Sequence, residues 1–218
     1  MAKFSKDVDI LKYESVLFTE LYLSNQVLIS GTGGSLSGTT FTVSGVDFVS
    51  AQILVGGVIY LQSSDGVLDG VFEIISVDSS TVLTVSVLRE DSEQSSVAPM
   101  AATNISYRVS TFGPQAVEAG FHLTEYFGIK PGNPASDIGP DDIMSANVLK
   151  QSSTFLVISS VYAMLAGQVK DENFWEKSLY YRRLFEKARE RCRLSIDVGS
   201  DGVADITELG GSVKLTRA

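Results

Sequence analysis

Apolar and polar positions follow a helical period over the longest amphipathic stretch of the chain, residues 173–195. At spacings of seven, four, three and four residues, one face of such a helix carries an apolar stripe made of Phe174, Tyr181, Phe185, Ala188 and Cys192. Arginine and lysine fill the opposite face: Arg182, Arg183, Lys187, Arg189, Arg191 and Arg193. The pattern predicts a long last helix whose apolar stripe closes a helical domain.

The same period predicts three more helices. The first covers residues 7–24, where Asp7 or Asp9 can cap a helix whose apolar face is Ile10, Tyr13, Leu17 and Leu21. The second covers residues 115–127, directly after a proline suited to a helix start. The third runs from Pro140-Asp141-Asp142 to about residue 166, where Gly167 ends it. Its segment 155–166 is apolar at ten of twelve positions, which is too short to span a bilayer and is typical of a buried core helix.

Residues 27–112 have a different composition, dominated by serine, threonine, valine and glycine. Short apolar runs bounded by turn residues predict strands at 40–43, 58–62, 71–77, 81–88 and 105–111. The glycine-rich residues 31–38 are interpreted as a flexible hairpin or barrel loop, and residues 89–103 as a long polar loop. Short strands with short polar links predict an antiparallel β-sandwich or small β-barrel.

The order of these elements predicts an α+β protein. The first helix cannot bury its stripe alone, so we expect it to pack on the helices beyond residue 113. Residues 1–26 and 113–209 would then form a discontinuous helical bundle, interrupted by an inserted all-β module at 27–112. Residues 210–218 would form an extended C-terminal arm.

Charge is distributed unevenly along this acidic chain. The net charge is −9 and the isoelectric point is about 4.6, which argues against a general binder of DNA or anionic membranes. Residues 173–195 nevertheless contain seven basic and three acidic residues, a net charge of +4, so the rest of the chain has a net charge of −13. This cationic helix has two interpretations. It is a solvated face with Glu186–Arg189 and Glu190–Arg193 pairs, or a surface that meets an acidic partner or nucleic acid.

Cysteine usage and the N-terminus bear on location. A single cysteine, Cys192, allows no disulfide within one chain and fits a reducing compartment. The first residues carry acidic groups before any apolar run, so we expect no signal peptide. The expected place of synthesis is the cytoplasm.

Catalytic and cofactor motifs are poorly supported. The only histidine, His122, and the only cysteine fall on different predicted helices and are interpreted as packing or surface residues. The glycine-rich loop lacks the lysine of a phosphate-binding loop, and no zinc spacing occurs. We therefore expect no enzyme activity and no cofactor.

One stretch after the last helix has a metal-like spacing. Asp197, Asp201, Gly202, Asp205 and Glu208 occupy positions 1, 5, 6, 9 and 12 of an EF-hand loop. Against a calcium site, Gly199 stands where an oxygen ligand belongs, and the glycines at 210 and 211 break any following helix. A turn of aspartates and glycines that ends the helix is the favoured interpretation, and calcium binding is the weaker one.

The segment 147–217 and the opening residues DVDILKYE resemble head–tail connector (adaptor) proteins of tailed bacteriophages. The resemblance covers residues 7–24 and 115–217, while the β module at 27–112 departs from it. It rests on the order of elements, which is two helices, an aspartate–glycine turn and a C-terminal arm, and it includes no invariant motif. The matching residues are Tyr162, Leu165, Tyr181, Phe185, Asp197, Asp201, Gly202, Asp205 and Arg217.

The resemblance implies a structural virion protein in the phage neck. Such adaptors form rings, usually of about twelve subunits, beneath the portal, and DNA passes through the ring without sequence-specific binding. The implied partners are the portal protein and further neck or tail proteins, with no membrane. The residues expected to contact the portal or a neighbouring subunit are Ser212, Val213, Lys214, Leu215, Thr216 and Arg217 in the arm, and Arg182, Arg183, Arg189 and Arg193.

A second interpretation treats the β module as a ligand-binding domain, with carbohydrate as the candidate ligand, carried by helices that dimerise. It requires aromatic side chains exposed on the sheet. The candidates mostly lie in apolar runs and look like core residues: Phe41, Phe48, Tyr60, Phe72, Tyr107 and Phe112.

Overall fold

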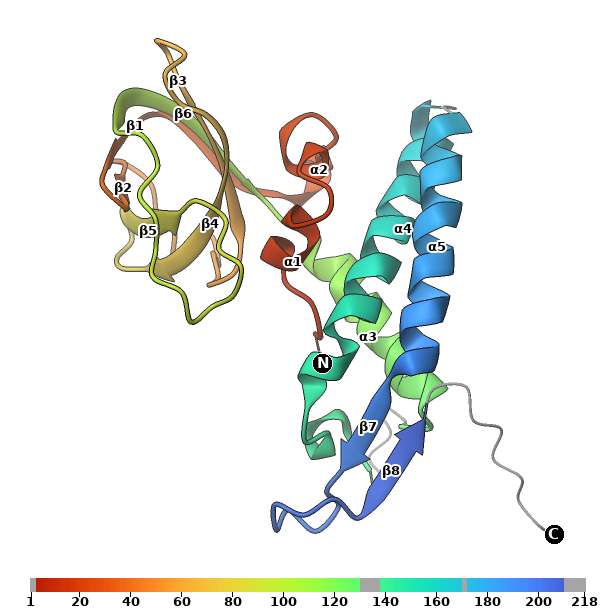
Figure 1. The fold of residues 1–218 in the computed structure, drawn as a ribbon. Coiled ribbons are helices and arrows are strands. Elements are labelled where there is room, and N and C mark those ends of the chain that lie inside the picture. The colour runs from red at the N-terminus through yellow and green to blue at the C-terminus, as the bar shows by residue number, and fades with distance from the viewer. Residues whose placement is uncertain (1–2, 130–137, 170–171, 210–218) are drawn as a thin grey trace, which may run out of the picture. The chain divides into compact units, whose positions relative to one another are not determined.

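The computed structural model describes residues 3–129, 138–169 and 172–209 (Figure 1). The protein is α+β, as the sequence predicts, and contains a six-stranded antiparallel β-barrel, three longer helices and a small C-terminal hairpin. The chain divides into two compact units. We call Ile10–Phe112 the barrel unit, and Met1–Asp9 together with Gly113–Ala218 the helical unit.

In the barrel unit, every neighbouring pair of strands is antiparallel and the sheet closes on itself in the order β1-β2-β5-β4-β3-β6. Of the two architectures that the sequence allowed, the barrel is therefore correct. Closure pairs both edges of the sheet, so no backbone row of the barrel is left as an open edge. The strands are β1 (Val27–Ser37), β2 (Thr40–Thr42), β3 (Val58–Ser63), β4 (Asp69–Val77), β5 (Val82–Ser86) and β6 (Ala102–Ser110).

The barrel interior is filled by large apolar side chains from the strands and from the segment between β2 and β3. Phe41, Phe48 and Tyr107 meet there, with ring centroids 5.5–6.3 Å apart. Leu61 and Ile74 are likewise completely buried. The apolar runs that predicted the strands therefore supply most of this core.

The glycine-rich residues 31–38 are not the flexible hairpin or barrel loop that the sequence predicts, because residues 31–37 belong to β1 and only Gly38 lies in the turn before β2. A Cβ atom on Gly31 would lie 2.6 Å from the Tyr107 hydroxyl oxygen, and one on Gly34 would lie 2.6 Å from the Phe41 ring. Gly33 adopts a φ of +83° within an irregular stretch of the β1–β6 pairing. These glycines make room for core aromatics, a role that the composition of the segment alone cannot reveal.

The expected helix over residues 7–24 is broken. Helix α1 (Asp7–Leu11) and the single turn α2 (Val16–Thr19) are followed by the 3₁₀ turn η1 (Ser24–Gln26). Helix α2 packs on β3 and β4, and the Phe18 ring meets Phe112 edge-on at 5.1 Å. The division into units accordingly places residues 10–26 with the barrel, where we had expected the helical domain. Burial of Leu17 and Phe18 outweighs the helical period.

The helical unit is built on two antiparallel helices, α4 (Lys150–Val169) and α5 (Glu172–Arg191), with α3 (Gly113–Tyr126) packed on α4 (Figure 1). Reciprocal hydrogen bonds join α4 and α5: the Ser159 hydroxyl donates to the Ser178 carbonyl, and the Ser178 hydroxyl donates to the Ser159 carbonyl, both at 2.9 Å. The Tyr162 ring stacks on Tyr181 at 6.3 Å. Small buried hydroxyls thus let the two helices approach closely.

The predicted helix over 140–166 begins ten residues late and continues past Gly167. Residues before Lys150 form two 3₁₀ turns, η2 (Pro140–Asp142) and η3 (Ala146–Leu149). Between them, the Met144 N–H donates to the Ser195 carbonyl and the Ile143 backbone bridges Ile196. Backbone pairing with a strand holds these residues extended. By length and composition, one described stretch (Ala146–Gln168) could cross a membrane, but 67% of its most apolar window is buried within the protein, as in a core helix.

The last helix ends at Arg191, four residues earlier than predicted. Residues Arg193–Ile196 form β7, which pairs with β8 (Ile206–Leu209) in an antiparallel hairpin (Figure 1). Leu194 and Ile196 are buried, so this strand has the alternation of a half-buried sheet. The hairpin was not predicted, because Cys192 continues the helical spacing of the apolar stripe and the pattern therefore extends the helix into the residues that form β7. The expected arm at 210–218 lies outside the described residues.

Candidate functional site

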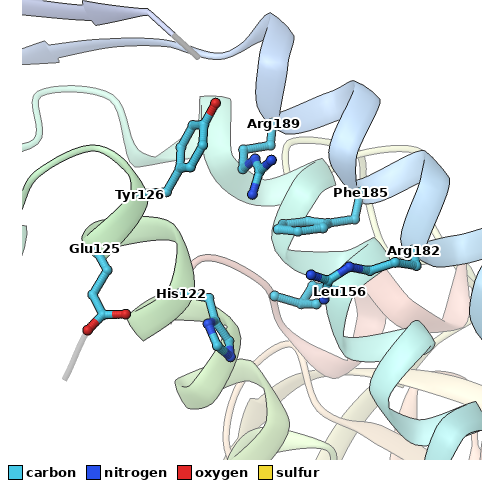
Figure 2. Close-up of a pocket in the computed structure, with 7 residues that line it drawn as sticks. All are labelled: His122, Glu125, Tyr126, Leu156, Arg182, Phe185 and Arg189. Carbon is cyan, nitrogen blue, oxygen red and sulfur yellow. The ribbon is translucent and has the colours of Figure 1, made fainter. Parts of the chain in front are cut away.

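One cavity of about 300 Å³ is described in the helical unit, between α3, α4 and α5. We call it the α3–α5 pocket. Figure 2 shows three side chains reaching from α5 toward α3. Its walls are His122, Glu125 and Tyr126 from α3, Leu156 from α4, and Arg182, Phe185 and Arg189 from α5.

Helix geometry explains why these side chains converge. Arg182, Phe185 and Arg189 are separated by three and four residues, so they lie on one face of α5. Phe185 belongs to the apolar stripe and is 2% exposed, which fixes that face against its neighbours. Arg182 and Arg189 therefore lie beside the apolar stripe and not on the opposite face, where the sequence analysis had placed them. The pocket lies along this edge of the stripe.

The arginines are held by aromatic rings. The Arg189 guanidinium lies 3.9 Å from the Tyr126 ring centroid and 5.1 Å from that of Phe185. The Arg182 guanidinium lies 5.3 Å from the Phe185 centroid, and its Nε is 3.4 Å from Glu186 Oε1. Within the described part of the chain, Nε of Arg189 is buried and has no hydrogen-bond partner. Stacking orients both cations, and Arg182 is also paired with Glu186.

His122 and Glu125 complete the pocket on the α3 side. His122 is more than half exposed, as the interpretation of a surface residue requires, and its Nε2 lies 3.8 Å from Glu118. The groups in the pocket are two guanidiniums, one imidazole and one carboxylate, together with aromatic and aliphatic surface. This set suits the binding of an anion that carries some apolar surface, such as an acidic side chain with its neighbours.

The four arginines predicted to bind a partner are not gathered in one place. Arg182 and Arg189 line the pocket together, whereas Arg183 is exposed on α5 and Arg193 is exposed on strand β7. The ion pair that the structure describes on this face of α5 joins Arg182 to Glu186. Residues Ser212–Arg217, also predicted to contact a partner, lie outside the described residues.

The aspartates with calcium-like spacing form the loop of the β7–β8 hairpin rather than a turn at a helix end. Asp197 accepts the backbone N–H groups of Asp201 and Gly202, at 3.2 and 2.7 Å. Asp205 Oδ2 accepts those of Val198 and Gly199, at 2.9 and 3.1 Å. Glu208 lies on β8, so no helix follows the loop. Among the described residues no cluster of three or more potential metal ligands occurs.

Cys192 is a buried core residue, as predicted. Its Sγ lies 3.2 Å from the Val148 carbonyl oxygen and 3.3 Å from that of Ala188. Burial raises the pKa of the Cys192 thiol, and a contact with the Ser152 hydroxyl opposes this in part. A buried thiol with a raised pKa is a poor nucleophile.

In the barrel unit, two arginines turn inward, and sequence analysis did not find either one. Arg89 forms a two-bond ion pair with Glu73, at 2.9 and 3.2 Å, and both side chains are about nine-tenths buried. The hydrogen bond to Glu73 raises the pKa of Arg89. Arg108 donates to the carbonyl groups of Phe18 and Thr19 and lies 3.6 Å from the Tyr22 ring centroid. The partners of both arginines are distant in sequence, so no local sequence pattern could predict these contacts.

The aromatic residues proposed for carbohydrate recognition are mostly in the core. Phe41, Phe48, Phe72, Tyr107 and Phe112 are each at most 9% exposed. Tyr60 is only partly buried, and its hydroxyl donates to Asp69 at 2.8 Å. The described barrel surface therefore offers no platform of stacked aromatics built from this set.

Comparison with known proteins gave no match: no protein-family model, no curated protein and no solved structure matches the chain. What the chain binds therefore has to be argued from its own side chains.

Proposed function

We propose that this protein is a structural, non-enzymatic virion component, a head–tail adaptor of a tailed bacteriophage. In this role its copies form a ring beneath the portal in the phage neck and prolong the DNA channel toward the tail. The protein would be made in the host cytoplasm, and its helical bundle would carry an inserted barrel and a C-terminal arm. The resemblance in residues 7–24 and 115–217 supports the role.

The α3–α5 pocket is the observation that carries this proposal furthest. It presents two arginines whose guanidiniums lie against aromatic rings. Such a surface suits an acidic protein partner. Arginine and aromatic residues are the types that dominate binding energy at protein interfaces. The partners on this view are a neighbouring copy, the portal, and further neck or tail proteins.

The charge of the chain supports the same role. A net charge of −9 disfavours tight contact with DNA phosphates, and a channel lining should let DNA slide past. The cationic side chains would then serve contacts between proteins rather than contacts with the genome. The arm at 210–218 would add to the portal contact as an extended segment pairing with a partner.

A binding experiment with portal particles of the same phage tests the role. The full chain is mixed with isolated portal rings, and the complexes are examined by sedimentation and negative-stain electron microscopy. We expect a second ring of about twelve copies stacked on the portal. A chain truncated after residue 209 should lose portal binding, while a chain with Glu20→Lys should keep it. Failure of the full chain to bind portal rings at any concentration would refute the adaptor role.

A further inference from the structure

Charge is divided between the two units. The barrel unit, residues 10–112, contains 10 acidic and 3 basic residues, a net of −7. The helical unit holds the remaining 16 of 26 acidic and 14 of 17 basic residues, a net of −2. Most of the cations of the chain are therefore on one unit, and the excess of anions is on the other.

The barrel unit also engages its few cations internally. Arg89 binds Glu73, Arg108 binds two backbone carbonyls, and Lys12 donates to the Glu90 carbonyl at 2.7 Å. Each of its three basic groups thus has a partner within the unit. The surface that the barrel unit presents to other molecules is therefore acidic, in keeping with its net charge.

The acidic charge is densest in the loop after β5. Glu90, Asp91 and Glu93 lie within four residues and are all exposed. The loop has a defined shape, because the Arg89 guanidinium donates to the carbonyls of Ser92 and Gln94, and Asp91 accepts two backbone N–H groups. Exposed apolar side chains flank it: Val87, Leu88 and Val97 are 42%, 36% and 56% exposed. We call residues 87–97 the acidic loop.

The acidic loop and the α3–α5 pocket are complementary in chemistry. The loop carries carboxylates beside small apolar side chains. The pocket carries two arginines beside Phe185 and Tyr126, against a single carboxylate, Glu125, on its α3 side. The Arg182 and Arg189 side chains line the pocket, so an incoming carboxylate would find guanidinium N–H donors there.

We infer that the acidic loop of one copy docks in the α3–α5 pocket of the next copy, with Glu90 and Glu93 facing Arg182 and Arg189. Such a contact joins two different surfaces, so every copy offers one of each to its neighbours, and repetition gives a ring or a filament. The head-to-tail contact follows from the two surfaces alone. Its closure into a ring rests on the proposed function.

A pair of charge reversals separates a contact between copies from a contact within one chain. The pocket variant is R182E/R189E and the loop variant is E90K/E93K. Each should fail to associate with itself because like charges face each other. In an equal mixture, both kinds of contact become complementary again, since the acidic pocket meets the basic loop and the native pocket meets the native loop.

Sedimentation velocity over a range of concentrations measures the outcome. We expect the native chain to self-associate, each variant alone to bind itself about a hundredfold more weakly, and the mixture to recover association as alternating copies. The matched controls reverse exposed charges elsewhere: K187E/R191E on α5 and E20K on the barrel unit should leave association unchanged. Because Arg189 stacks on Tyr126, R182E alone replaces the double variant if circular dichroism shows a loss of helix.

Three results would overturn the inference: a native chain that stays monomeric at every concentration, variants that associate as well as the native chain, or a mixture that stays monomeric. Rings on portal particles that are insensitive to these reversals would refute the inference and leave the adaptor role standing. Restored association in the mixture, without any binding to portal rings, would uphold the inference and refute the adaptor role.

Discussion

The two units of this protein reach a packed interior by different means. The barrel unit fills its interior with large side chains such as Phe41, Phe48 and Tyr107, and glycines on β1 give them room. The helical unit also buries apolar side chains, such as Ile158 and Tyr162, but it adds buried hydroxyls, and those of Ser159 and Ser178 join α4 to α5. The difference teaches that apolar volume alone fills the barrel, whereas the α4–α5 contact combines apolar packing with satisfied hydroxyls.

The units also use arginine differently. Arg89 and Arg108 in the barrel unit are anchored on a carboxylate and on backbone carbonyls. Arg182 and Arg189 in the helical unit rest on aromatic rings at the edge of a cavity. The same residue type therefore supports the fold in one unit and lines an open pocket in the other.

The largest effect should come from the barrel core. Replacing Phe41 by alanine removes a fully buried ring and should lower the free energy of unfolding by about 3–5 kcal/mol. Urea unfolding followed by circular dichroism measures the loss, and the single tryptophan, Trp175, reports separately on the helical unit. The exposed neighbour Thr42→Ala is the control. If Trp175 fluorescence and the barrel signal shift together, the units unfold as one and the comparison fails.

The second effect should come from the buried ion pair. Glu73→Gln leaves Arg89 buried with a poorer partner and should cost about 3 kcal/mol of unfolding free energy. It should also make the acidic loop easier to cleave by protease, because Arg89 holds the carbonyls of Ser92 and Gln94. Arg183→Gln on the exposed face of α5 should change neither quantity. Unchanged stability and cleavage in Glu73→Gln would show that the pair does not support the barrel.

A smaller effect is expected between α4 and α5. Ser159→Ala and Ser178→Ala should each cost about 1 kcal/mol, because each removes one of two reciprocal hydrogen bonds. The loss of unfolding free energy in the double variant should differ from the sum of the two single losses, because the two serines are in contact. Ser160→Ala serves as the control, because that hydroxyl donates to the Leu156 carbonyl of its own helix. Strict additivity would argue that the serines do not act as a pair.

The smallest effect concerns reactivity rather than stability. Cys192 should react with iodoacetamide far more slowly than an exposed thiol at pH 8, because burial raises its pKa and lowers the thiolate fraction. The reference is Val203→Cys in a Cys192→Ser chain, since Val203 is 64% exposed in the hairpin loop. The rate for Cys192 should rise only at higher pH than that of the reference. Equal rates would show that the helical unit opens readily around this thiol.

The sequence indicated the fold class, five of the six barrel strands and the helices α3, α4 and α5 to within a few residues at most ends. These elements carry apolar runs bounded by turn residues or helical periods, which are local properties of the sequence. The predictions that were wrong share a cause. The first helix breaks because Phe18 packs on the barrel, and β1 is a strand because its glycines accommodate Tyr107 and Phe41. Each depends on a residue far away in the chain.

The candidate site was predictable only in part. The basic face of the last helix marked Arg182 and Arg189 as partner-binding residues, and the structure adds the aromatic contacts that orient them. Tyr126 and His122 could not be assigned to the same site, because nothing in the spacing of α3 says which helix it meets. The acidic loop was visible only as a long polar loop until Arg89 was seen to turn inward.

By itself, the sequence determined where side chains repeat with a strand or helix period, how charge is distributed, and which chemistry the chain lacks the motifs for. These properties are local or additive, so the order of residues is sufficient for them. Only the tertiary structure decided that the sheet closes into a barrel, that residues 10–26 join it, and that two arginines share a cavity with an aromatic floor. Those outcomes depend on contacts between distant segments, whose free energies outweigh local preference.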